Sequence, residues 1–234
     1  MGLEKGRNFT PYLPGAFLET LFVLSLFLFL LAPAKKVEAI SYIPDGTIIS
    51  TNTIWDQTGS PFVIEGRVTI PNNVALVVKE GVVIKFAPYS LFTVNGQLKI
   101  LGLPQNKVYL TSLLDDTIAG DTNGDGNLST SSYFEGWGID FRYGALPHLI
   151  TNADVKYLRS GLWFDTTSAD LDGVNVSDSD QTIGGYKSSI TLQNSTLSTF
   201  DDGIYADGGS FEISDTLFEH IFDWSGDAMA FYNR

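Results

Sequence analysis

The sequence predicts an all-β fold in which short strands wind into a solenoid. Three observations support this prediction. Short runs of Val, Ile, Phe and Thr alternate with polar residues from Pro61 onward, which is typical of half-buried strands. No segment after residue 40 carries the amphipathic pattern of a three-turn helix. The second half of the chain repeats with a period of about 21 residues, and such a period is typical of solenoids.

The repeat places similar residues at regular intervals. One apolar position recurs every 20 or 21 residues, at Val155, Val176, Leu197 and Leu217. Each follows a polar lead-in and precedes a polar turn with Gly or Asp-Gly. A single repeat cannot bury its apolar side alone, so we expect successive coils to stack about 4.8 Å apart. An antiparallel sandwich is the alternative fold, and the lack of obvious hairpin turns speaks against it.

The first half of the chain contains the opening coils. Residues 40–62 are expected to cap the first coil, and the solenoid is expected to occupy residues 63–234. Residues 113–135 interrupt the strand pattern as one 23-residue insertion. The predicted strands of this half are 62–64, 68–70, 76–78, 82–86, 91–94, 97–100, 108–111 and 138–141.

Several stretches resemble a known group of proteins. They are TIWDQTGSPFVIEGRVTIPNNVALVVKEGVVIKF (53–86), LFTVNGQLKILG (91–102), VYLTSLLDD (108–116) and FEGWGIDF (134–141), together with the four repeats. They resemble the coils of right-handed parallel β-helix proteins of the pectin-lyase-like group, in which a coil of about twenty residues contains three short strands. The resemblance covers most of residues 53–234 and implies a secreted or surface protein of bacterial or archaeal type. It implies no particular activity, because one fold can carry many functions.

The first 39 residues have the layout of a secretory signal peptide. The apolar run LFVLSLFLFLLAPA (21–34) follows Lys5 and Arg7, and small residues follow the run. We expect cleavage near Ala39, which would place the protein outside the cell or on its surface. An uncleaved N-terminal membrane anchor is the alternative.

Charge and cysteine content limit the partners. Residues 40–234 carry 10 basic and 24 acidic side chains, a net charge of −14. This charge repels nucleic acid and anionic membranes, so neither is expected as a partner, whereas a polysaccharide or cell-surface glycan is compatible with it. The chain has no cysteine, which excludes disulfides and thiolate metal sites.

The stretch GDTNGDGN (120–127) predicts a calcium-binding loop inside the insertion. Calcium prefers several oxygen ligands in a flexible loop. The predicted ligands stand at alternate positions and are Asp121, Asn123, Asp125 and, through its backbone carbonyl, Asn127. We expect this calcium ion to be structural. The alternative is a solvated turn rich in Asp, Asn and Gly.

The loop departs from the EF-hand pattern. An EF-hand has a bidentate Glu at its twelfth position, where this chain has Ser132, and no flanking helices are predicted. The loop therefore resembles Asp-x-Asn-x-Asp-Gly loops found outside EF-hands. Asp116 and Glu135 are the candidate further ligands within the insertion.

Three charged residues are expected to form a column on one turn of the solenoid. Arg159, Asp180 and Asp201 each stand four residues after a repeated apolar residue. Stacked carboxylates repel each other, and Arg159 is placed to neutralise Asp180. The column is either an acidic face for binding or catalysis, or a set of ordinary turn residues.

The candidate catalytic residues are Asp201, Asp202 and Asp223. The DDG at 201–203 resembles the Asp-Asp pair of polygalacturonase-like hydrolases, and an inverting hydrolase needs two carboxyl groups roughly 6.5–9.5 Å apart. The Gly-His-Gly and Arg-x-Lys signatures of those enzymes are absent. We therefore favour a non-enzymatic module for glycan binding, adhesion or structural support. A polysaccharide hydrolase or pectate-lyase-like enzyme is the alternative.

Aromatic residues are candidate platforms for sugars, because flat rings stack on the apolar faces of pyranoses. We expect Trp137 to close the insertion against the coils, and Trp163 and Trp224 to face solvent. The other candidates are Trp55, Tyr133, Tyr143, Tyr186 and Tyr205.

The last coil ends at AMAFYNR (228–234) without a polar cap. An uncapped solenoid end exposes apolar core and a strand edge. We therefore expect further coils beyond Arg234, or a partner at this end.

Overall fold

The computed structural model describes residues 40–126, 128–132, 135–144, 146–221 and 229–232. The chain divides into two units, residues 1–37 and 38–234, and the first unit lies outside the described residues together with the predicted signal peptide. The described residues form strands and turns without a helix. Accordingly, this part of the chain contains no helix of the length and apolarity needed to cross a membrane.

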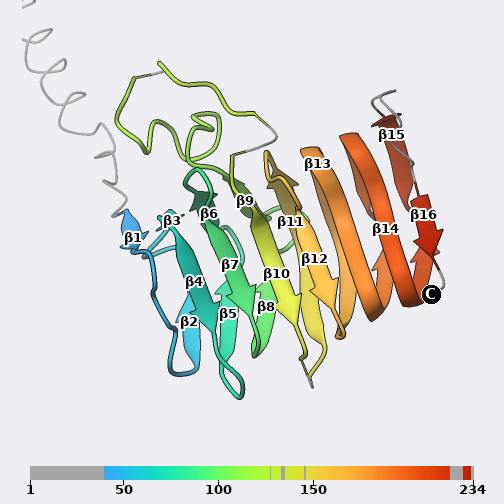
Figure 1. The fold of residues 1–234 in the computed structure, drawn as a ribbon. Helices are drawn as coiled ribbons and strands as arrows, with labels where there is room; N and C mark the ends of the chain where they lie inside the picture. Colours follow the sequence, from blue (N-terminus) through green and yellow to red (C-terminus); the bar gives the residue numbers. More distant parts are fainter. Residues whose placement is uncertain (1–39, 127, 133–134, 145, 222–228, 233–234) are drawn as a thin grey trace, which may run out of the picture. The chain divides into compact units, whose positions relative to one another are not determined.

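The described residues wind into a parallel β-solenoid, or β-helix, of about eight turns (Figure 1). All pairs between the named strands are parallel, which excludes the antiparallel sandwich. Coils contain about 22 residues, close to the predicted 21. The predicted all-β solenoid is therefore confirmed.

Three walls, which we name A, B and C, run along the solenoid, and successive coils add strands to each. Wall A contains β1 (Ser41–Ile43), β3 (Phe62–Ile64), β6 (Val83–Phe86), β9 (Val108–Ser112) and β15 (Leu217–Ile221). Wall B contains β4 (Arg67–Ile70), β7 (Leu91–Val94), β10 (Gly138–Arg142), β12 (Leu162–Asp165) and β16 (Met229–Tyr232). Wall C contains β2 (Thr53–Trp55), β5 (Ala75–Lys79) and β8 (Gln97–Leu101).

Three strands turn corners and contribute to more than one wall. They are β11 (His148–Lys156), β13 (Ser168–Gln193) and β14 (Thr196–Ser214). Within β13, for example, residues 174–177 belong to wall A and residues 183–186 to wall B. At the other end of the solenoid, β1 and β2 lie in the segment expected to form a cap, and they pair in parallel with β3 and β5.

Stacked apolar side chains hold the coils together. Side chains alternate between the core and the outer face along each strand. In wall A, Val155 pairs with Val176 and Val176 pairs with Leu197, all facing inward and fully buried. Burying a side chain of this size stabilises the fold by roughly 1.5–3 kcal/mol. The same ladder includes Phe62, Ile84, Leu110 and Phe218.

The prediction that Leu217 belongs to this ladder is wrong. Leu217 pairs with Thr196 and is 51% exposed, whereas Phe218 pairs with Leu197 and packs against the core. The coil keeps 21 residues here instead of the 20 that the spacing of leucines indicated. A shift of one residue along a strand moves a side chain to the opposite face.

The insertion leaves wall A after β9 and returns to wall B at β10 (Figure 1). The coil register continues across the insertion, because Leu91 pairs with Gly138, which comes 47 positions later in the chain. Near its start the insertion folds over the outer face of wall A. There Lys85 and Thr111 point outward and pair in register, yet both are buried.

Candidate functional site

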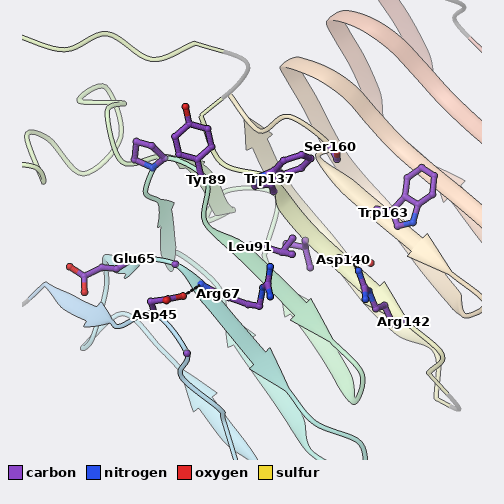
Figure 2. Close-up of a pocket in the computed structure, with 14 residues that line it drawn as sticks. Asp45, Glu65, Arg67, Tyr89, Leu91, Trp137, Asp140, Arg142, Ser160 and Trp163 are labelled. Atoms are coloured by element: carbon purple, nitrogen blue, oxygen red, sulfur yellow. Dashed lines mark hydrogen bonds and ion pairs between the residues drawn. The ribbon is translucent and has the colours of Figure 1, made fainter.

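The outer side of wall B is hollowed by a groove of about 1000 Å³ (Figure 2). Its floor is formed by β4, β7, β10 and β12, and one edge by the turns that connect walls A and B. The side chains that decide its chemistry are Arg67, Leu91, Asp140, Arg142 and Trp163 on the floor, and Tyr89 and Trp137 at the edge.

One row of outward-facing residues runs across the floor, with one residue in each coil. Thr93 pairs with Asp140, and Asp140 pairs with Trp163. Their strand neighbours, such as Ile139 and Phe141, are buried in the core, so the alternation turns Asp140 and Trp163 outward. We name this set the floor row; it consists of Thr69, Thr93, Asp140, Trp163, Gly184 and Tyr205.

Asp140 and Arg142 form an ion pair on β10. Asp140 Oδ2 accepts a hydrogen bond from Arg142 Nε at 2.7 Å and also contacts Nη2. This hydrogen bond raises the pKa of Arg142 above its ordinary value, because it favours the charged guanidinium. Asp140 is 9% exposed, and its Oδ1 atom has no hydrogen-bond partner among the described residues. The pair thus fixes a half-exposed guanidinium at the floor of the groove.

Arg67 brings a second guanidinium from β4. Its backbone N–H donates to Asp45 Oδ1 at 2.6 Å, which ties the strand to the preceding turn. Its side chain makes no ion pair with any described residue. Figure 2 shows this side chain directed toward Leu91, whereas Glu65 extends away from it.

The Trp163 indole lies over a position that has no side chain. A Cβ atom at Gly184 would overlap the Cε3 atom of Trp163. The absence of a side chain at Gly184 therefore allows the Trp163 ring to pack against the backbone there. Tyr205 follows in the next coil, with its ring centroid 5.9 Å from that of Trp163 and the ring planes 25° apart. Trp163, Gly184 and Tyr205 therefore form one aromatic shelf across three coils. Figure 2 shows the broad face of the indole beside β12.

Two more aromatic side chains border the groove at its edge. Tyr89 is 80% exposed, and its N–H donates to the carbonyl of Glu135 at 2.6 Å. Trp137 is 41% exposed, its N–H donates to Ser90 O at 2.8 Å, and the Arg159 guanidinium lies 4.4 Å from the centre of its ring. These backbone bonds attach the returning end of the insertion to the edge of the groove.

The expected column of charges continues from this edge. Arg159 Nε lies 3.8 Å from Asp180 Oδ2, and the register of β13 with β14 places Asp201 beside Asp180. Burial raises the pKa of Asp180, the charge of Asp201 adds to the rise, and Arg159 opposes it. Asp202 is exposed, and Asp223 lies outside the described residues. The pairing of Asp201 or Asp202 with Asp223 in catalysis therefore stays a prediction.

The other candidate platforms lie elsewhere. Trp55 is buried and stacks on Phe62, with 4.3 Å between ring centroids, so it belongs to the core. Tyr143 is 68% exposed, and Tyr186 neighbours Lys187, whose Nζ lies 4.9 Å from the centre of its ring. Trp224 and Tyr133 lie outside the described residues.

Three acidic side chains of the insertion approach one another. Carboxylate oxygens of Asp116, Asp121 and Asp125 lie within 4.8 Å of each other, a spacing that a metal ion could bridge. The loop folds around Asp121, whose carboxylate accepts the backbone N–H groups of residues 124, 125 and 126.

The remaining predicted ligands differ in their placement. Asn123 Nδ2 donates to Asp125 Oδ2 at 2.9 Å. Glu135 accepts hydrogen bonds from Ser112 and Ser132, away from this group of three. Asn127 lies outside the described residues.

A buried lysine fixes the insertion to the solenoid. Lys85 is fully buried, and its ammonium donates to the carbonyls of Asp115 and Gly120, both at 2.9 Å. Burial lowers the pKa of Lys85, and nearby carboxylates of the insertion oppose this effect. Asp115 also bonds Thr111 Oγ1 at 2.6 Å. The sequence offered one sign of this contact, a lone lysine inside the apolar strand VVIKF.

Sequence reasoning also missed Arg67, Asp140 and Arg142. In GIDFR (138–142) the two charged residues alternate with Ile139 and Phe141, so the strand period could have placed them on the outer face. Their convergence with Trp163 depends on the stacking of coils 23 residues apart.

Comparisons with known protein families, with curated proteins and with solved structures find no match to this chain. The described residues therefore define this protein by its fold, as an all-β parallel solenoid.

Proposed function

We propose that this protein is a non-enzymatic glycan-binding β-helix, and that the groove on wall B binds a polysaccharide chain. The observation that carries this proposal is the convergence of Trp163 and Trp137 with the Asp140–Arg142 ion pair in one groove of about 1000 Å³. Aromatic faces stack on pyranose rings, and a few fixed polar groups select the hydroxyl pattern.

The setting of this function follows from the sequence pattern. The layout of residues 1–39 supports export to the cell surface or the extracellular space, and the repeats support a right-handed β-helix of the pectin-lyase-like type. A structural calcium ion in the insertion is part of the proposal. The approach of Asp116, Asp121 and Asp125 supports it.

Binding to a panel of immobilised polysaccharides tests the proposal. We expect the protein to be retained by at least one of them, and Trp163→Ala to lose most of that retention. Tyr42→Ala is the matched control, because Tyr42 is an exposed aromatic residue on wall A. Equal retention of Trp163→Ala and Tyr42→Ala, or retention of the wild type by no polysaccharide, would contradict the proposal.

A polysaccharide hydrolase or lyase is the second candidate, and one observation favours it. Asp140 presents a buried carboxylate beside the groove, and Asp180 and Asp201 continue the acidic surface. Reducing-sugar and unsaturated-product assays over pectin, alginate and xylan separate the two functions. Product formation that is lost in Asp140→Asn or in Asp201→Asn would favour the enzyme; binding without product supports the non-enzymatic module.

A further inference from the structure

We infer that the groove binds an uncharged polysaccharide rather than a polyuronate, and that the glycan lies on the aromatic shelf formed by Trp163, Gly184 and Tyr205. This inference rests on the proposed glycan-binding function and specifies its ligand class. It follows from the charges that face the groove and from the geometry of the shelf.

Acidic side chains outnumber basic ones in the lining of the groove. Its lining contains three carboxylates, from Asp45, Glu65 and Asp140, and two guanidinium groups, from Arg67 and Arg142. Asp140 already neutralises Arg142, so that pair offers no spare positive charge to a ligand. The charged side chains that remain are Arg67, Asp45 and Glu65. Together they carry a net negative charge, which does not favour a ligand with one carboxylate on every sugar.

The surfaces beside the shelf are acidic as well. The outward row next to the floor row runs from Arg142 to Asp165, Tyr186 and Asp207. On the other side lie Arg159, Asp180 and Asp201, and Asp201 is close enough to Asp180 to raise its pKa. Around the shelf, the four carboxylates of Asp165, Asp180, Asp201 and Asp207 outnumber the two cations of Arg159 and Lys187. A polyuronate lying on the shelf would therefore meet a net negative surface. Such repulsion is largely screened only beyond about 8–10 Å at moderate ionic strength.

Within the described residues, the three carboxylates close enough to share a metal ion lie in the insertion, not in the groove. The described part of the groove thus shows no such set of acids to hold a cation between the wall and an acidic sugar. Uncharged sugars need no such cation.

The shelf suits the apolar face of a sugar ring. The Trp163 ring reaches across Gly184 toward Tyr205, so aromatic surface extends along the solenoid beyond the groove itself. The coils are stacked about 4.8 Å apart, comparable to the length of one sugar unit in an extended chain. Neighbouring sugars can therefore meet neighbouring coils. Arg142, half exposed and held by Asp140, supplies hydrogen-bond donors for hydroxyl groups on the same floor.

Calorimetric titration of the full-length protein with hexasaccharides tests this inference. The uncharged probes are cellohexaose, mannohexaose and xylohexaose, and the acidic probe is hexagalacturonate, in low-salt buffer without added metal ions. We expect at least one uncharged probe to bind about tenfold or more tightly than hexagalacturonate. We also expect added sodium chloride to narrow the difference, because salt screens repulsion.

Two variants locate the sugar on the shelf. Gly184→Ala should displace the Trp163 ring, and Tyr205→Ala should shorten the shelf; each is expected to weaken the uncharged probe about tenfold. Tyr42→Ala is the control and should leave the affinity unchanged. Tyr205→Ala removes only a surface ring, so it tests the placement on the shelf even if Gly184→Ala does not fold.

The outcomes separate the inference from the proposed function. Hexagalacturonate binding as tightly as the uncharged probes, or more tightly, would overturn the inference and leave glycan binding in place. Uncharged probes that bind equally well to Tyr205→Ala and to the wild type would overturn the placement on the shelf. Failure of every probe to bind would overturn both proposals.

Discussion

Lys85 donates a hydrogen bond to the carbonyl of Gly120 at 2.9 Å, joining wall A to a point 35 residues further along the chain. The same ammonium bonds Asp115 O, so one side chain from the solenoid fastens two turns of the insertion. No cysteine is available to make a covalent connection of this kind. The connection is instead a buried ammonium paired with carbonyl oxygens.

Lys85→Met should loosen the insertion without disturbing the ladders of the core. The variant leaves the buried carbonyl of Asp115 and the partly buried carbonyl of Gly120 without their donor, which should cost about 2 kcal/mol of unfolding free energy after the gain from removing a buried charge. Chemical denaturation and limited proteolysis within residues 113–137 measure the effect. Lys79→Met, at an exposed position of β5, is the control. Equal stability and equal cleavage of the two variants would show that Lys85 does not hold the insertion against wall A.

His148 should make the fold sensitive to mild acid. The Leu98 N–H donates to His148 Nδ1 at 3.2 Å, so the ring is neutral and carries its proton on Nε2, which has no partner among the described residues. Burial lowers the pKa of His148 from 6.5 to about 4. The unfolded state therefore binds more protons between these two values, and stability falls as the pH drops from about 6.5 to about 4.

The decrease in unfolding free energy that His148 contributes should reach about 3 kcal/mol at the acid end of this pH window. Denaturant titrations at pH 7 and pH 4 measure it. His148→Asn keeps an acceptor for Leu98 N–H but does not titrate, so its stability should change less over the same interval. Parallel pH profiles of the two proteins would show that His148 does not control this response.

Calcium should raise the thermal stability if the insertion binds it. At a concentration one hundred times its dissociation constant, a ligand bound only by the folded state adds about 2.7 kcal/mol. Asp121→Asn removes one negative charge while keeping an acceptor for the loop N–H groups, so it should abolish most of the gain. Asp170→Asn, exposed on wall C, is the charge-matched control. An unchanged melting temperature in calcium and in chelator, with no heat of binding, would remove calcium from the proposal.

The corrected register of the last ladder can be checked by two leucine substitutions. Leu197 is fully buried between Val176 and Phe218, so Leu197→Ala should cost about 2–5 kcal/mol. Leu217 is 51% exposed, so Leu217→Ala should cost less than about 0.5 kcal/mol. Equal costs, measured by denaturation, would restore the register that the sequence spacing suggested.

The coil period could be predicted from sequence because it depends on local alternation repeated many times. Val155, Val176 and Leu197 share a frame, and the core requires them to stack. The same reasoning failed by one position at Leu217, where two adjacent apolar residues, Leu217 and Phe218, both fitted the frame. Only the pairing with β14 decides which of them points inward.

The groove could not be predicted, because it depends on residues that are distant in sequence. Asp140 pairs with Trp163 within the next coil, but it meets Thr93 only across the insertion. Lys85 is a lone charge in the apolar strand VVIKF, but the sequence does not show which segment covers it. The column of Arg159, Asp180 and Asp201 was predictable because no insertion interrupts those coils.

The insertion enters at a corner of the solenoid and leaves the register of both flanking walls intact. The strands beneath it therefore do not depend on its length, and loops of other sequence could be exchanged at this corner. Such an exchange would uncover Lys85 and Thr111, two polar side chains that water can solvate in place of their present partners in the insertion. The chain thus has a grafting point, where new binding loops could be placed beside an unchanged groove floor.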